Sequence, residues 1–231
     1  MPTSSCSDLS PAAAYAIYGD VMPGRIKRSY RRYREGSSAF KVDFAIEGHI
    51  PWTNPDCARA GTDHLGGTFA EVADTERQRA QGKMAQRPFV LVGQQYLADP
   101  SRSAGNVNPI WAYAHVPFGY TGDATAAVVD QIERFAPGFR DTITATVSTS
   151  TAGLEAYNPN YIGGDIIGGA NDRLQVVLRP RVAVNPYATG VAGVYLCSQS
   201  TPPGAGIHGL CGYHAAQSAL RWLRKRGARS L

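Results

Sequence analysis

The sequence predicts an α+β fold, a mixed α/β arrangement in which helices flank one sheet. Strict alternation of apolar and polar residues from Phe40 to Ile46 is typical of a half-buried strand. Between Asp123 and Phe135, apolar residues recur instead at helical spacing and form one stripe. Because 43% of the residues are hydrophobic and 18% are charged, the chain has enough apolar side chains to bury a core.

The other elements can be assigned in chain order. Residues 1–20 are rich in Ser, Ala and Pro and predict a poorly ordered lead-in with one helical turn at most. Ile26, Tyr30 and Tyr33 are spaced by four and three residues, which predicts a helix over residues 22–34 that ends at Gly36. The remaining predictions are strands over residues 61–67, 88–95, 110–116 and 143–150, a helix over residues 69–83 capped by Thr68, and a short helix from Leu154.

The last part of the chain combines an apolar strand, a glycine-rich segment and a helix. Residues 193–197 predict the strand, residues 204–209 (Gly-Ala-Gly-Ile-His-Gly) follow, and a helix is expected from His208 to about Arg224. A dinucleotide-binding fingerprint needs a tight turn before the glycines and an acidic residue about 20 residues later. Here residues 198–203 lengthen the turn, and no acidic residue follows Asp172. The segment therefore indicates the closing strand and helix of a site whose main part lies elsewhere.

Positive charge is concentrated in two clusters. They hold 11 of the 23 basic residues and leave 12 basic against 18 acidic residues elsewhere, which argues against a uniformly basic nucleic-acid-binding protein. The favoured interpretation is a solvated face on each of two helices, and contact with phosphate or an anionic membrane surface is the alternative. The clusters are Arg25, Lys27, Arg28, Arg31, Arg32 and Arg34, and Arg221, Arg224, Lys225, Arg226 and Arg229.

Cysteine usage favours a reducing compartment. Cys6, Cys57, Cys197 and Cys211 are scattered without a CxxC pair, which argues against a disulfide framework and a structural zinc site. The histidines show no ligand spacing, so no metal is expected. No apolar run reaches the roughly 18–20 residues that span a bilayer. We expect a cytoplasmic protein.

Residues 195–216, from Tyr195 to Ala216, resemble the C-terminal flavin motif of phytoene dehydrogenase-like FAD-dependent oxidoreductases, within the amine-oxidase flavoprotein superfamily. This closing motif is specific, and further matches run in family order over nearly the whole chain. They are residues 40–43 (Phe-Lys-Val-Asp), 50–52 (Ile-Pro-Trp), 61–67, 87–89 (Arg-Pro-Phe), 133–139, 158–160 (Asn-Pro-Asn) with 163–165 (Gly-Gly-Asp), and 179–180 (Arg-Pro).

The resemblance implies a C-terminal half. It implies a lead-in over residues 1–21, a substrate-binding domain over residues 22–185, and the last strand and helix of an FAD-binding domain over residues 186–231, without the N-terminal Rossmann unit. Such a half would help to transfer hydride from an apolar, lipid-like substrate to flavin, with only part of the FAD site. A separate N-terminal half or a second copy would be its partner. The alternative is a non-catalytic fragment or protein-interaction module that cannot hold FAD.

Candidate cofactor-binding residues lie in the closing motif. Glycine lets the backbone approach a flat ring, and peptide N–H groups at a helix N-terminus favour an electron-rich acceptor. Gln199 stands where many flavoproteins have an acidic residue. His208 is either a proton donor over the flavin or a packing residue whose backbone alone matters. The candidates are Ser198, Gln199, Ser200, Gly204, Gly206, Ile207, His208 and Gly209.

Candidate substrate-binding residues come from two places. Residues 158–172 form a Gly- and Asn-rich loop, and long loops of this kind are usually functional or disordered. In the family the corresponding stretch approaches the substrate cavity, so Asp165 and Asn171 are candidates, with a mobile surface loop as the alternative. Trp111 and Tyr113 are candidates to line an apolar tunnel, and core packing is the favoured alternative. No catalytic residue can be named.

Overall fold

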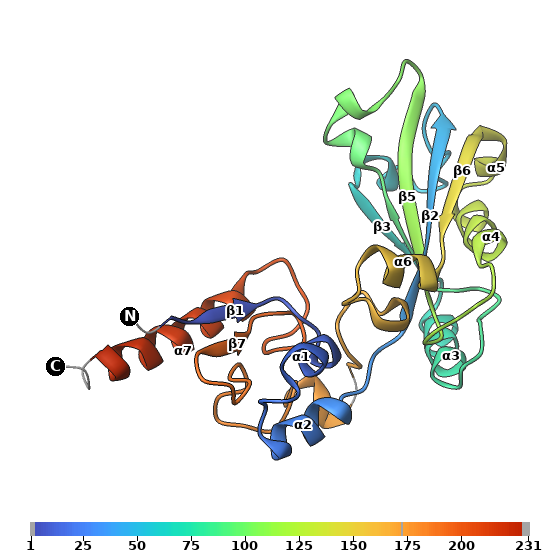
Figure 1. The fold of residues 1–231 in the computed structure, drawn as a ribbon. Coiled ribbons are helices and arrows are strands. Elements are labelled where there is room, and N and C mark those ends of the chain that lie inside the picture. Colours follow the sequence, from blue (N-terminus) through green and yellow to red (C-terminus); the bar gives the residue numbers. More distant parts are fainter. Residues whose placement is uncertain (1–2, 172, 228–231) are drawn as a thin grey trace. The chain divides into compact units, whose positions relative to one another are not determined.

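The computed structural model describes residues 3–171 and 173–227. The chain divides into two compact units. Unit 1 consists of the chain up to Gly36 together with the chain from Asn158 onward, and unit 2 is the continuous segment Ser37–Tyr157. The predicted α+β class is confirmed, because helices and strands occur in both units (Figure 1). Asp172, and Arg229 of the second basic cluster, lie outside the described residues.

Unit 2 is built on a five-stranded antiparallel sheet with the strand order β3-β4-β5-β2-β6. The two longest strands lie next to each other and pair along their whole length, from Ser38 opposite Val116 to Glu47 opposite Val107. The strands are β2 (Ser38–Glu47), β3 (Thr62–Leu65), β4 (Val90–Gly93), β5 (Val107–Val116) and β6 (Ile143–Thr149).

One face of this sheet is buried. Side chains along β5 alternate between buried and partly exposed, so that Ile110, Ala112, Ala114 and Val116 all face the core. Helix α4 (Thr125–Phe135) packs there with Val128 and Ile132, as its apolar stripe predicts. The other helices of unit 2 are α3 (Phe69–Ala80), α5 (Phe139–Thr142) and α6 (Thr151–Tyr157), with 3-10 turns at Cys57–Arg59, Gln95–Leu97 and Pro100–Arg102.

Unit 1 is organised around a short parallel pair of strands. Strand β1 (Ser5–Ser7) pairs with β7 (Val194–Leu196), and the Cys197 N–H donates to the Ser7 carbonyl at 3.0 Å. Successive β7 side chains point to opposite faces. Leu196 packs with α1 (Pro11–Tyr18) and α2 (Gly24–Arg31), whereas Tyr195 packs with Ala215 and Ala219 of α7 (Leu210–Gly227). Two 3-10 turns, Ile162–Gly164 and Arg173–Val176, interrupt the long connection before β7.

The N-terminal residues differ from the prediction. They form β1 and α1 rather than a poorly ordered lead-in. The Ser10 side chain accepts from the Ala13 N–H at 3.1 Å and Pro11 occupies the start of α1, which is a favourable helix N-terminus. The strand could not be predicted because Ser5, Cys6 and Ser7 carry no apolar alternation and their partner lies near the other end of the chain.

The compact units also follow a different division from the predicted domains. Residues 22–36 and 158–185 belong to unit 1, together with the closing strand and helix, and residues 37–157 form unit 2 by themselves. The physical reason is that α2 packs in the cluster that contains Leu196, so it shares a core with the closing strand. The functions assigned to the predicted domains stay predictions.

Among the described residues, no helix combines the length and the apolar character needed to cross a membrane.

Candidate functional site

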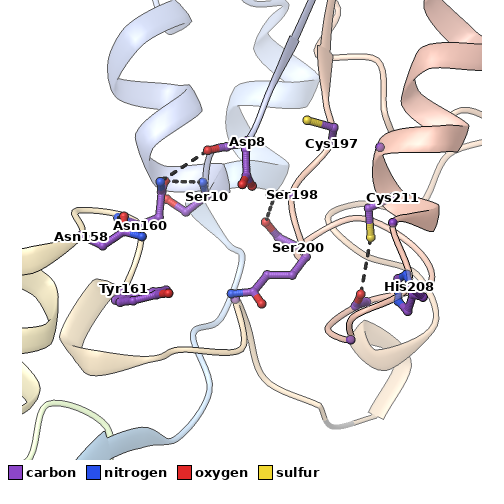
Figure 2. A pocket seen from close by; sticks show the side chains of 16 residues that line it. Asp8, Ser10, Asn158, Asn160, Tyr161, Cys197, Ser198, Ser200, His208 and Cys211 are labelled. Atoms are coloured by element: carbon purple, nitrogen blue, oxygen red, sulfur yellow. Dashed lines mark hydrogen bonds between the residues drawn. The ribbon is translucent and has the colours of Figure 1, made fainter. Parts of the chain in front are cut away.

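Unit 1 contains a cavity of about 400 Å³ at the glycine-rich segment (Figure 2). Seven of the eight predicted cofactor-binding residues line it, and Ile207, which is fully exposed, does not. The cavity wall comes from the N-terminal segment, the loop after residue 157, the turn after β7 and the start of α7. The lining residues are Asp8, Ser10, Asn158, Asn160, Tyr161, Gly168, Cys197, Ser198, Gln199, Ser200, Gly204, Gly206, His208, Gly209, Cys211 and Gly212.

Glycines shape the wall beside α7. Gly204, Gly206 and Gly209 have φ values of 107°, 151° and 66°, conformations that residues with a side chain rarely adopt. A Cβ on Gly206 would lie 2.8 Å from Cδ2 of His208, so the backbone itself forms the surface there. The Cys211 thiol lies 3.4 Å from the carbonyl oxygens of Thr201 and Gly204, which joins this segment to α7.

His208 caps the first turn of α7. Its Nδ1 accepts a hydrogen bond from the Leu210 N–H at 3.0 Å, so the proton of the neutral ring is on Nε2. Among the described residues, no acceptor is bonded to the backbone N–H groups of Ile207 and His208. These two residues lie in the turn directly before α7, whose N-terminal end carries partial positive charge.

The turn after β7 is internally bonded. The hydroxyls of Ser198 and Ser200 are 2.7 Å apart and buried, and the Thr201 hydroxyl donates to the Ser198 carbonyl at 2.7 Å. Gln199 turns its amide toward the neighbouring loop, where Nε2 donates to the Ile166 carbonyl at 2.9 Å. The side chain of Gln199 therefore fixes the loop that borders the cavity.

Asp165 organises that loop. Its carboxylate is fully buried and accepts four backbone hydrogen bonds, from Gly36 (2.6 Å), Ile167 (2.8 Å), Gly168 (3.0 Å) and Gly169 (2.7 Å). Because these donors satisfy both carboxylate oxygens, hydrogen bonds hold the segment around Asp165 in a defined conformation. Asp165 itself does not line the cavity.

Glu35 lies close to this carboxylate. Burial, and secondarily the negative charge of Asp165, raise the pKa of Glu35 to about 7. Near neutral pH its carboxyl group is therefore partly protonated, which is unusual for a glutamate.

Asn171 is linked to the cavity wall through Arg179. The Asn171 Oδ1 accepts from the Arg179 guanidinium, which also donates to the Gln199 carbonyl at 3.2 Å. Arg179 is only 1% exposed, and a Cβ on Gly204 would lie 3.5 Å from its Nη1. Sequence reasoning did not select Arg179 as a site residue, although residues 179–180 were among the matches to the family.

Trp111 and Tyr113 belong to unit 2 and therefore not to this cavity. Both project from β5 on the sheet face opposite the core and are partly exposed, so core packing does not describe them. Their rings are nearly parallel, with an interplanar angle of 2° and centroids 6.0 Å apart. His115 follows at 5.7 Å from Tyr113, and burial lowers the pKa of His115. This face is an aromatic row along one strand.

The cysteines are free thiols. Cys197 and Cys211 line the cavity, and burial, with smaller contributions from Asp8 and the neighbouring thiols, raises the pKa of Cys197 to about 11. The Cys197 thiol is therefore protonated at neutral pH and a poor nucleophile. Within the part of the chain that the structure describes, no group of His, Cys, Asp or Glu side chains could hold a metal ion.

Comparison with known proteins finds a partial similarity to an oxidoreductase-domain protein. Over 98 residues the chain is 35% identical to pyridine nucleotide-disulfide oxidoreductase domain-containing protein 2 of Mus musculus and 34% identical to the protein of that name from Rattus norvegicus. The chain contains an oxidoreductase-like region. The match covers 42% of this chain but only 17% of each relative, so the chain corresponds to a small part of those proteins. No family model matches the chain.

The structure also assigns residues to the cavity that the sequence did not suggest. Asp8 and Ser10 come from the N-terminal segment, where the Ser10 N–H donates to Oδ1 of Asn160 at 2.8 Å. In the sequence, the pair Ser10-Pro11 is typical of the start of a helix, and this pattern could have indicated that the N-terminal segment is ordered. Its connection to Asn160 depends on a contact across 150 positions of the chain, which no local pattern contains.

Proposed function

We propose that the chain is the C-terminal half of an FAD-dependent oxidoreductase of the phytoene dehydrogenase-like class, and that the cavity in unit 1 receives the flavin end of FAD. The observation that carries this proposal is the glycine wall, where three glycines with positive φ values face an open cavity. The partial similarity to an oxidoreductase-domain protein supports the general class.

The residues present fit such a ligand. The cavity of about 400 Å³ is at the lower end of the range for ligand pockets, which suits one end of a large dinucleotide. A Cβ on Gly206 would lie 2.8 Å from the His208 ring and would be strained at a φ of 151°, so glycine keeps this part of the wall free of a side chain. The remaining contacts to FAD, including those to its adenosine part, would come from polypeptide outside this chain.

Each part of the cavity has a role in this proposal. The N–H groups of Ile207 and His208 would donate to an electron-rich edge of the ring, where the dipole of α7 favours negative charge. Ser198, Gln199 and Ser200 would border the chain that links the ring to the phosphates. Bound flavin would supply a hydride acceptor. Within unit 1, Asn171, which is held in place by Arg179, would contact the substrate. Separately from this cavity, the aromatic row of unit 2 with Trp111 and Tyr113 would offer an apolar contact surface.

Flavin titration of the purified chain tests the proposal. We expect weak binding of FAD, detected as quenching of flavin fluorescence and as a rise in the melting temperature, because a ligand at ten times its Kd adds about 1.4 kcal/mol to folding stability. Gly206→Ala should abolish this rise. Gly61→Ala is the matched control, since a Cβ there meets no atom within 4 Å.

The outcomes separate the two candidate functions. If neither FAD nor FMN raises the melting temperature at about 1 mM, the chain is a fragment that cannot hold flavin, and the proposal fails. A submicromolar Kd for FAD would contradict the partial site, because the chain would then supply a complete set of contacts. Equal binding by Gly206→Ala and the unchanged protein would place the ligand away from the glycine wall.

We further propose that another polypeptide segment completes the site, either a separate N-terminal half or a second copy. Parallel strands normally occur in larger sheets covered on both faces, whereas β1 and β7 form a pair of only two. Apolar side chains on α7 are also exposed, among them Tyr213 and Leu220. Gel filtration at increasing protein concentration tests the second copy, and a monomer at all concentrations would leave the separate half as the partner. We expect a cytoplasmic location, which fractionation can test.

A further inference from the structure

A second cavity of unit 1 lies between α2 and the segment after Arg179. It measures about 510 Å³ and shares no lining residue with the glycine cavity, so it is independent of the proposed flavin site. Its charged part consists of Arg25 and Arg181, and Ser29 and Asn185 are its other polar side chains. Its apolar part includes Ile26, Val182 and Val184.

Arg181 is held in a fixed orientation. Its Nη2 donates to the carbonyl oxygens of Asn185 (3.0 Å) and Ala188 (2.9 Å). The buried hydroxyl of Tyr30 lies beside this guanidinium and interacts with it. A guanidinium that is held in place by these contacts presents its positive charge to the cavity in a fixed orientation.

No carboxylate in the described part of the chain forms an ion pair with Arg25 or Arg181. Burial lowers the pKa of Arg181, the neighbouring Tyr30 opposes this shift, and the nearby charge of Arg25 adds to it. Two like charges that share a cavity without a counter-ion repel each other, and a bound anion would remove that repulsion.

The apolar side of the cavity opens toward solvent. Val182 is 77% exposed and Val184 is fully exposed, while Ile26 is buried at the base. Large aliphatic side chains that are left in water beside a charged site suggest a ligand with its own apolar part. A small inorganic anion would leave these side chains uncovered.

We propose that this cavity binds an amphiphilic phosphate monoester, with the phosphate between Arg25 and Arg181 and the apolar chain along Val182 and Val184. A phosphate monoester carries close to two negative charges at neutral pH, which matches two guanidinium groups, whereas a carboxylate would balance only one. Ser29 lines the cavity too, but its hydroxyl donates to the Arg25 carbonyl at 3.1 Å, so the phosphate is assigned to the two arginines. The ligand is either a soluble amphiphile or a headgroup of a lipid bilayer.

Binding assays with the full chain can separate these sources. The soluble probe is dihexanoyl phosphatidic acid below its micellar concentration, measured by calorimetry, and the bilayer probe is cosedimentation with phosphatidylcholine vesicles with or without phosphatidic acid. Arg25→Gln should weaken binding at least about tenfold, as expected for the loss of one charge-assisted contact. Lys27→Gln and Arg28→Gln are the matched controls, because both residues lie on α2 but line a different cavity.

A second variant tests the other arginine of the cavity. Arg181→Gln should also weaken binding about tenfold, and a melting curve shows whether the loss of its two carbonyl contacts unfolds the protein. Arg25 donates no side-chain hydrogen bond to a described residue, so Arg25→Gln carries the conclusion if Arg181→Gln does not fold. If Arg25→Gln loses binding to the vesicles but not to dihexanoyl phosphatidic acid, the bilayer source is supported. If it loses binding to dihexanoyl phosphatidic acid, the soluble source is supported. Equal losses in Lys27→Gln would show only a general attraction to basic residues and would overturn the proposal.

Two comparison ligands test the two halves of the assignment. Decanoate carries an apolar chain with a carboxylate, and binding as tight as that of the phosphate would overturn the choice of headgroup. Inorganic phosphate lacks the apolar chain, and binding as tight as that of dihexanoyl phosphatidic acid would overturn the role of Val182 and Val184.

Discussion

The backbone of Gly93 makes room for the indole of Trp111. The two residues lie opposite each other on β4 and β5, and a Cβ at position 93 would be 2.3 Å from Cε2 of the indole. The ring therefore occupies the space that any side chain at position 93 would need. This contact sets the orientation of Trp111 and, through the parallel rings, of the aromatic row that continues to Tyr113.

Gly93→Ala should destabilise the protein by about 1–3 kcal/mol, because the new methyl group must displace the indole or the strand. Urea unfolding measures the loss, and the fluorescence of Trp111 should change in the folded state. Gly61→Ala introduces the same methyl group where no atom lies within 4 Å and serves as the control. An unchanged stability of Gly93→Ala would mean that the indole moves away without cost.

Asp165→Asn should cost about 3 kcal/mol. The substitution replaces an acceptor of four backbone N–H groups with an amide that must turn its own NH₂ group toward some of them. Hydrogen exchange should become faster at Ile167, Gly168 and Gly169 in particular. Asp20→Asn changes an exposed aspartate of the same unit and should leave both quantities unchanged. Slow exchange retained at these three amides would contradict the role of Asp165.

Glu35 should make the protein less stable as the pH rises through neutrality. Its folded-state pKa of about 7 lies above the ordinary value of 4.5, so the stabilising contribution is fully present below about pH 4.5 and is lost as the pH rises through 7. Glu35→Gln should therefore raise the melting temperature at pH 8 relative to the unchanged protein and have little effect at pH 5. Glu47→Gln is the control at an exposed position. A melting temperature of Glu35→Gln that falls between pH 5 and pH 8 as it does in the unchanged protein would disprove this assignment.

Glu71 has the opposite pH dependence. Hydrogen bonds from Arg134, and then from the backbone and hydroxyl of Thr68, lower the pKa of Glu71 to about 2. Its stabilising contribution is present above about pH 4.5 and is lost as the pH falls toward 2. Glu71→Gln should lower the melting temperature at pH 7, and the difference should shrink at acid pH. Melting curves from pH 7 to pH 2, with Glu47→Gln measured in parallel, check both signs.

The parts of the fold that sequence predicted are those governed by local periodicity. Phe40–Ile46 lies within β2 because one face of that strand is buried, which produces the period of two. Helix α3 begins at Phe69, directly after the predicted Thr68 cap. Strand β1 and the four-residue helix α5 were missed, since neither is long enough to produce a pattern.

The candidate site was predictable only in its local component. The glycines of residues 204–209 are visible in the sequence itself, and the structure needs them because a Cβ would be strained there. Arg179 and Asp165 could not be placed in the same way. Their importance comes from partners that the fold brings together, such as Gly36 with Asp165 and Gln199 with Arg179. The position of the aromatic row on the outer sheet face, rather than in the core, likewise depends on which face α4 covers.

The parallel pairing of β1 with β7 sets an order of events during synthesis. Every strand of the five-stranded sheet is available once Thr149 has been made, whereas Ser5–Ser7 must wait for Val194–Leu196. Because a polypeptide is made from its N-terminal side, Ala14, Ile26 and Tyr30 stay without their Leu196 neighbour until residue 196 has been translated. Strand β1 is thus made well before its partner β7, so this pair can close only after every strand of the five-stranded sheet exists.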